Sequence, residues 1–86
     1  MSDQSSKMEA SFSTLVLSIG SSAAMALGIA PDPVSGEAKI DKPMAQFNID
    51  LLIMLQEKTK SNLAKEEEEF LSRMVNDLQM KYVEIK

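Results

Sequence analysis

The stretch that decides the fold is Met44–Leu63, which reads MAQFNIDLLIMLQEKTKSNL. Nine apolar residues lie between positions 44 and 55, and at 100° per residue they cover most of the circumference of a helix. Only Gln46, Asp50 and Glu57 form a consistent polar strip. Because a helix that is apolar nearly all round is normally buried from more than one side, this stretch predicts the centre of a small helical protein.

Local signals define where this central helix begins. Asp41 is a good N-cap, and Pro43 falls in the first turn, where the missing N–H of proline costs no hydrogen bond. We therefore expect a helix over residues 42–58.

A second amphipathic helix follows a short turn at Thr59–Asn62. Beyond this turn, apolar residues recur at three- and four-residue steps, which is the spacing of one helix face. The run Glu66–Glu69 falls in the first turns, where carboxylates complement the helix dipole. These glutamates point around the whole helix, so they cannot converge on one metal ion. We expect a helix over residues 63–83, packed as an antiparallel hairpin on helix 42–58.

The uncharged run Ala10–Pro31 is long enough, at about 1.5 Å per residue, to cross a bilayer as a helix. It separates into an apolar side, a hydroxyl side and a ridge of small residues that includes Gly20, Ala24 and Gly28. A membrane-spanning helix would leave the hydroxyl side to be buried elsewhere, and the flanks lack an aromatic belt. We expect a soluble helix over residues 8–27, with a membrane anchor over residues 10–31 as the alternative.

The ridge of Gly20, Ala24 and Gly28 has the small-xxx-small spacing that lets two helix backbones approach closely. This spacing fits a tight crossing within the chain, with Gly28 as a C-cap, and it also fits the seam of a homodimer. The crossing within the chain is the favoured interpretation. The linker that follows, residues 29–40, contains helix-breaking proline and glycine and is long for a helical hairpin.

Length limits the architecture. A chain of 86 residues forms one domain at most, and a domain this small buries only about 60% of its unfolded surface. The polar residues 1–7 are interpreted as a disordered tail, which leaves residues 8–86 as a single helical domain. The predicted fold is all-α, a small bundle of three helices. Because two of the helices are broadly apolar, we expect oligomerisation to complete the bundle, with a homodimer favoured over other homo-oligomers.

Composition limits the chemistry. The sequence contains no cysteine and no histidine, which removes thiolate metal sites, thiol nucleophiles and ordinary histidine acid–base catalysis. A net charge of −4 opposes the phosphate neutralisation that direct nucleic-acid binding needs. We therefore expect neither an enzyme nor a cofactor or metal site. The lack of cysteine also fits a cytoplasmic location.

Candidate interaction residues lie on the first two helices. Asn48 falls in the middle of the apolar side of the central helix. A buried asparagine there can set the register of a partner, or it can simply bond to a neighbouring backbone group or to water. The candidate interaction surface consists of Gly20, Ala24, Gly28, Phe47, Asn48, Leu51 and Leu55.

Several motifs are shared with a known family. They are F-x-x-L-V-x-S at Phe12–Ser18, Leu27-Gly28, I-D-L-L-x-x-L-x-x-K-T-x-x-N-L at Ile49–Leu63, Glu66-Glu67 and Tyr82. In these residues the chain resembles a family of small uncharacterised bacterial proteins, domain of unknown function 1844. The resemblance implies a small helical cytoplasmic protein with no established activity. Some relatives are encoded near translation genes.

The family pattern differs from this chain at two positions. It usually has glycine in place of Ser61, and threonine or serine in place of Ala64. The resemblance implies that the latter position is the N-cap of a capping box closed by Glu67, whose carboxylate bends back to the backbone.

The expected function is a non-enzymatic helical module for protein interaction or oligomerisation, with an unknown protein partner as a further option. Two alternatives remain open: a membrane-associated protein anchored by residues 10–31, and an accessory factor linked to translation.

Overall fold

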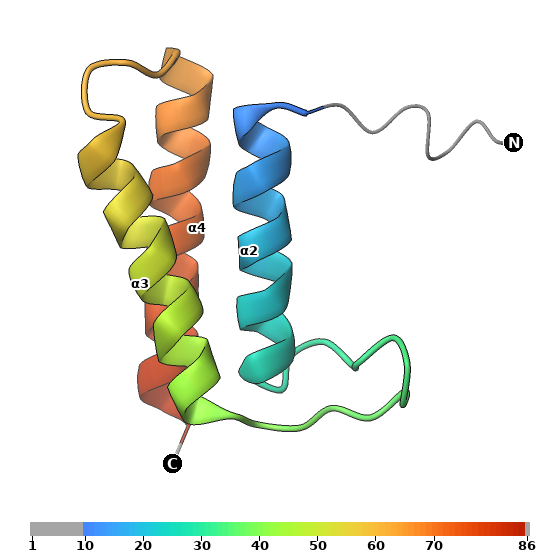
Figure 1. Ribbon diagram of the computed structural model, residues 1–86. Helices are drawn as coiled ribbons and strands as arrows, with labels where there is room; N and C mark the ends of the chain where they lie inside the picture. Colours follow the sequence, from blue (N-terminus) through green and yellow to red (C-terminus); the bar gives the residue numbers. More distant parts are fainter. Residues whose placement is uncertain (1–9, 86) are drawn as a thin grey trace, which may run out of the picture.

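The computed structural model describes residues 10–85, and within them the chain forms three α-helices and no strand (Figure 1). They are α2 (Phe12–Ala26), α3 (Lys42–Lys58) and α4 (Lys65–Glu84). The three helices pack side by side, and α3 and α4 form an antiparallel hairpin. The prediction of an all-α fold with three helices is confirmed. The predicted tail at residues 1–7 lies outside the described residues.

Helix α2 is shorter than expected at both ends. It begins at Phe12 instead of residue 8, because Ser11 has an extended backbone and its hydroxyl accepts a hydrogen bond from the Thr14 N–H at 3.1 Å. At the other end the N–H of Gly28 donates to the Met25 carbonyl at 3.0 Å. Leu27 is the C-cap, and Gly28 follows it with a left-handed φ of 77°, so the prediction that Gly28 ends this helix is confirmed.

The linker between α2 and α3 is closed at its base. Leu27 and Ile40 form an isolated antiparallel bridge, and the Asp41 N–H donates to the Ala26 carbonyl at 2.7 Å. Within the loop, the backbone N–H of Asp32 donates to the Glu37 carbonyl at 2.9 Å. These bonds return the chain to the end of α2, which is where α3 begins.

Caps set the ends of the hairpin helices. The Asp41 carboxylate accepts from the Met44 N–H at 3.2 Å, which confirms the predicted N-cap of α3. At the end of α3 the Thr59 hydroxyl donates to the Leu55 carbonyl at 2.6 Å. Helix α4 begins at Lys65, two residues later than expected, because Ala64 is extended and occupies the N-cap position.

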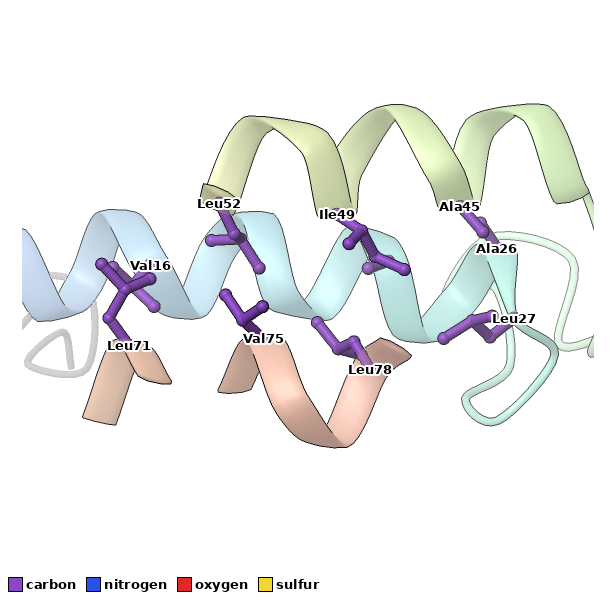
Figure 2. Packing of buried hydrophobic residues seen from close by; sticks show 10 residues of the cluster. Val16, Ala26, Leu27, Ala45, Ile49, Leu52, Leu71, Val75 and Leu78 are labelled. Carbon is purple, nitrogen blue, oxygen red and sulfur yellow. The ribbon is translucent and has the colours of Figure 1, made fainter. Parts of the chain in front are cut away.

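The core lies where α2, α3 and α4 meet, because each of the three helices packs against the other two. In Figure 2, apolar side chains of α3 approach α2 from one side and those of α4 from the other. The largest fully buried side chains are Val16, Ile49, Leu52 and Leu71. The core cluster consists of Val16, Ala23, Ala26, Leu27, Ala45, Ile49, Leu52, Leu71, Val75 and Leu78.

The run considered as a membrane anchor is not one continuous helix. Helix α2 has 15 residues, so it is about 22 Å long, and a spanning helix needs about 20 apolar residues. Among residues 10–85, none of the helices combines the length and the apolar character needed to cross a membrane.

Candidate interaction surface

Packing within the chain covers only part of α3. Its Ala45, Ile49 and Leu52 face the core and are at most 1% exposed. On another side of the same helix, Met44 is 48% exposed and Phe47 is 55% exposed. Other described residues therefore cover α3 less completely than its apolar circumference led us to expect.

The exposed apolar residues of α3 form a continuous stripe. They stand at positions 44, 47, 51 and 54, which are steps of three, four and three residues and place the side chains on one helix face. Leu51 is half-buried and Met54 is 40% exposed. We call Met44, Phe47, Leu51 and Met54 the α3 stripe.

A groove between α2 and α3 lies beside this stripe. It has a volume of about 390 Å³ and is lined by Ser22, Met25 and Ala26 of α2 and by Met44 and Asn48 of α3. Its charged lining residues are outside the helices: Asp32, Lys39 and Asp41. The groove is therefore uncharged where the two helices form its walls, and its charges lie along the linker.

Helix α2 carries an exposed apolar residue, Leu15, on the side that lines the groove. Leu15 is 45% exposed and stands seven residues before Ser22, which puts both residues on the same stripe of α2. None of Leu15, Ser22, Met25 and the residues of the α3 stripe carries a charge.

Asn48 is bonded within its own helix. The residue is 6% exposed, and its side-chain nitrogen donates to the Met44 carbonyl at 2.9 Å. The sequence allowed two roles for Asn48: setting the register of a partner, or bonding to a neighbouring backbone group. The hydrogen bond to Met44 is the second of these. Asn48 also lines the groove, so a partner that enters the groove would meet this amide.

The polar strip borders the α3 stripe on its other side. The Gln46 side-chain nitrogen donates to an Asp50 carboxylate oxygen at 2.8 Å. Asp50 and Glu57 are both exposed. At 100° per residue, these carboxylates stand at the border of the stripe and not on it.

Two of the small residues proposed for interaction are occupied within the chain. A Cβ on Gly20 would lie 2.7 Å from the Met74 sulfur of α4, and a Cβ on Gly28 would lie 2.8 Å from Cγ1 of Ile40. Both glycines therefore permit close approaches inside the protein, in line with the favoured crossing within the chain. Ala24 is half-buried, and Leu55 is partly buried and packs against the core.

A second hollow lies at the turn between α3 and α4. It has a volume of about 220 Å³, and Gln56, Thr59, Lys60, Ser61 and Ser72 are among its lining residues. The side chains of Gln56 and Ser72 hydrogen-bond across it at 3.4 Å. Within residues 10–85, no three acidic side chains are grouped so that they could hold a metal ion.

The structure adds four residues to the candidate surface: Leu15, Met25, Met44 and Met54. The 3-4-3 spacing that joins the two α3 methionines to Phe47 and Leu51 is visible in the sequence. Which side of α3 stays uncovered depends on how α2 and α4 pack, and the sequence pattern alone does not determine this.

The structure thus defines a small all-α protein with an uncharged apolar face. The chain matches the family described as a domain of unknown function, DUF1844, over residues 9–84, and it belongs to that family. A search of the curated proteins found no match, and neither did a search of the solved structures.

Proposed function

We propose that this protein is a non-enzymatic, cytoplasmic interaction module that associates with itself, most simply as a dimer. The observation that carries the proposal is the α3 stripe, where Phe47 is 55% exposed and Met44 is 48% exposed. Aromatic residues and methionine are enriched at protein interfaces relative to other surfaces.

The size of the domain supports self-association. A chain of 86 residues has little interior, yet this chain leaves apolar side chains of its central helix at the surface. Burying these side chains in a complex removes their apolar surface from water and stabilises the complex by about 25 cal/mol for each Å² buried. The non-enzymatic part of the proposal rests on composition, because the chain contains no histidine and no cysteine.

Size-exclusion chromatography with light scattering tests the proposal. The 9.5 kDa chain at micromolar concentration is expected to give the mass of a dimer. A mass of one chain throughout the micromolar range would refute self-association.

A further inference from the structure

We propose that the partner of the uncharged surface over the α2–α3 groove is the same surface of a second copy of this chain, joined by two-fold symmetry. This inference rests on the proposed function and assigns its site. We call the surface the α2–α3 face. It consists of Leu15 and Met25 of α2 and Met44, Phe47, Leu51 and Met54 of α3.

The distribution of charge favours a second copy over a strongly charged partner. Helix α2 carries no charged residue, and the four residues of the α3 stripe are uncharged, with Lys58 following them at the end of the same side of α3. Helix α4, in contrast, begins with the run Lys65–Glu69 and continues with further charges. A basic or acidic partner would find no counter-charge on the α2–α3 face and would have to bury its own charge unpaired. A second copy presents an uncharged face, so pairing the two faces buries no ionised group.

Charged groups at the edge of the face fit the rim of an interface. Asp32, Lys39 and Asp41 stand at the linker end of the groove, and the Asp50 carboxylate stands at the border of the stripe. Protein interfaces typically have an apolar centre depleted in charge and a polar rim that stays accessible to water. The α2–α3 face has this arrangement.

The exposed apolar area fits a dimer of ordinary size. Leu15, Met44, Phe47 and Met54 are between 40% and 55% exposed. Taking roughly 200 Å² for a large side chain, these residues leave on the order of 400 Å² of apolar surface per copy. A standard interface buries about 800 Å² per partner, of which a little more than half is apolar. The α2–α3 face therefore supplies about the apolar area that one partner contributes to such an interface.

The face contains both a protruding side chain and a place to receive one. Phe47 is 55% exposed on α3, and the 390 Å³ groove lined by Met25, Met44 and Asn48 shares Met44 with the α3 stripe. A two-fold interface requires each copy to carry both complementary parts on one surface. Methionine side chains adapt to the shape of an inserted ring, which suits the lining of the groove.

Charged substitutions test the assignment. Phe47→Glu and, separately, Met54→Glu are expected to weaken dimerisation by roughly thirty-fold or more, because each buries a carboxylate at the centre of the interface. Met80→Glu and Val83→Glu are matched controls on α4, where these residues are 62% and 77% exposed. Both controls are expected to leave the dimer intact, and circular dichroism should show unchanged helix content in all four variants.

Each pattern of results has a definite meaning. A dimer that survives both Phe47→Glu and Met54→Glu, or that dissociates only when α4 is changed, would overturn the assignment and leave self-association in place. A wild-type protein that is monomeric would overturn the proposed function itself.

Oxidation of native methionines gives a second test that needs no substitution. Dilute hydrogen peroxide is expected to convert Met44 and Met54 to sulfoxides slowly in the dimer and faster after dilution to monomer, as followed by peptide mass spectrometry. Met80 of α4 is the internal control, and its rate should not change with protein concentration. Rates at Met44 and Met54 that stay constant while light scattering reports dissociation would contradict the assigned face.

Discussion

Gly20 of α2 lies against Met74 of α4, so close that a Cβ added to the glycine would be 2.7 Å from the methionine sulfur. Gly20 is buried, and Met74 is half-buried and packs against the core. The small residue therefore sets how closely α2 and α4 approach. The part of the small-residue ridge that lies at Gly20 belongs to the interior of the protein.

The contact predicts a coupling between the two residues. Alanine favours a helix over glycine by up to about 1 kcal/mol, but a methyl group at position 20 must displace the flexible end of Met74. We expect Gly20→Ala to stabilise the protein more in a Met74→Ala background than in the wild type, by about 0.5–1.5 kcal/mol. Urea unfolding of the four proteins measures this difference. Equal effects in the two backgrounds would show that the contact does not limit packing.

A comparison of alanine substitutions at Gly28 and Gly36 distinguishes the cost of backbone strain from the cost of a packing clash. Gly28 and Gly36 have nearly the same positive φ, 77° and 76°. A Cβ at position 28 would lie 2.8 Å from Cγ1 of Ile40, whereas a Cβ at position 36 would meet nothing within 4 Å. We expect Gly36→Ala to cost about 0.5–1 kcal/mol, which is the roughly 1–2 kcal/mol penalty of the left-handed backbone less the roughly 0.5–1 kcal/mol that the lower unfolded-state freedom of alanine returns.

Gly28→Ala is expected to cost about 1 kcal/mol more than Gly36→Ala, because Ile40 has to move away from the bridge that closes the linker. Thermal unfolding of the two variants under identical conditions provides the comparison. If Gly28→Ala proved no more destabilising than Gly36→Ala, Ile40 would not be held in place at the end of α2.

Features that depend on neighbouring residues could be predicted from the sequence. Asp41 caps α3 through a bond to the N–H of Met44, three residues on, and Gly28 ends α2 through bonds that span one turn. Such signals need only the local chain, so the cap positions follow from residue type and spacing. The apolar spacing predicts a start of α2 four residues too early, because that spacing carries no information about the cap formed by Ser11.

The candidate surface depended on tertiary packing and was predicted only in part. Helix α3 is apolar on several sides, and its period does not show which side α2 and α4 will cover. Phe47 and Leu51 were identified, but Met44 and Met54 were not, although all four residues share the α3 stripe. The role of Gly20 likewise depends on Met74, which is distant in sequence.

Ser61 has a φ of 70°, in the left-handed region that favours glycine. This is the position at which the family pattern usually has glycine. A residue with a Cβ costs about 1–2 kcal/mol in this region, and glycine removes that cost. Glycine also has more conformational freedom in the unfolded state, which offsets about 0.5–1 kcal/mol of the stability gained. Ser61→Gly is therefore expected to raise the free energy of unfolding by about 0.5–1 kcal/mol in urea titration.

Ser61→Ala is the matched control for this prediction, because it removes the hydroxyl but keeps the Cβ. It should leave stability close to that of the wild type. A gain in Ser61→Ala equal to that in Ser61→Gly would mean that the hydroxyl, and not the backbone conformation, is the source of the cost.

The start of α4 carries half of a capping box. The Ala64 N–H donates to a Glu67 carboxylate oxygen at 3.0 Å, as the resemblance implied for this glutamate. The reciprocal bond is missing because the methyl group of Ala64 cannot accept from the Glu67 N–H. Ala64 already has the extended backbone of an N-cap, with φ −64° and ψ 157°.

Ala64→Ser should therefore complete the box without moving the backbone and stabilise the protein by about 1 kcal/mol. Ala64→Val is the control, because valine favours an extended backbone but its side chain has no hydrogen-bond acceptor. It should bring no such gain in stability. A complete capping box also needs Glu67, whose carboxylate accepts from the N–H of residue 64. Glu67→Ala is therefore expected to lower the free energy of unfolding of the Ala64→Ser protein by about 0.5–1.5 kcal/mol. Chemical denaturation of these variants decides the matter, and equal stability of the serine and valine variants would show that α4 gains nothing from a hydroxyl at its N-cap.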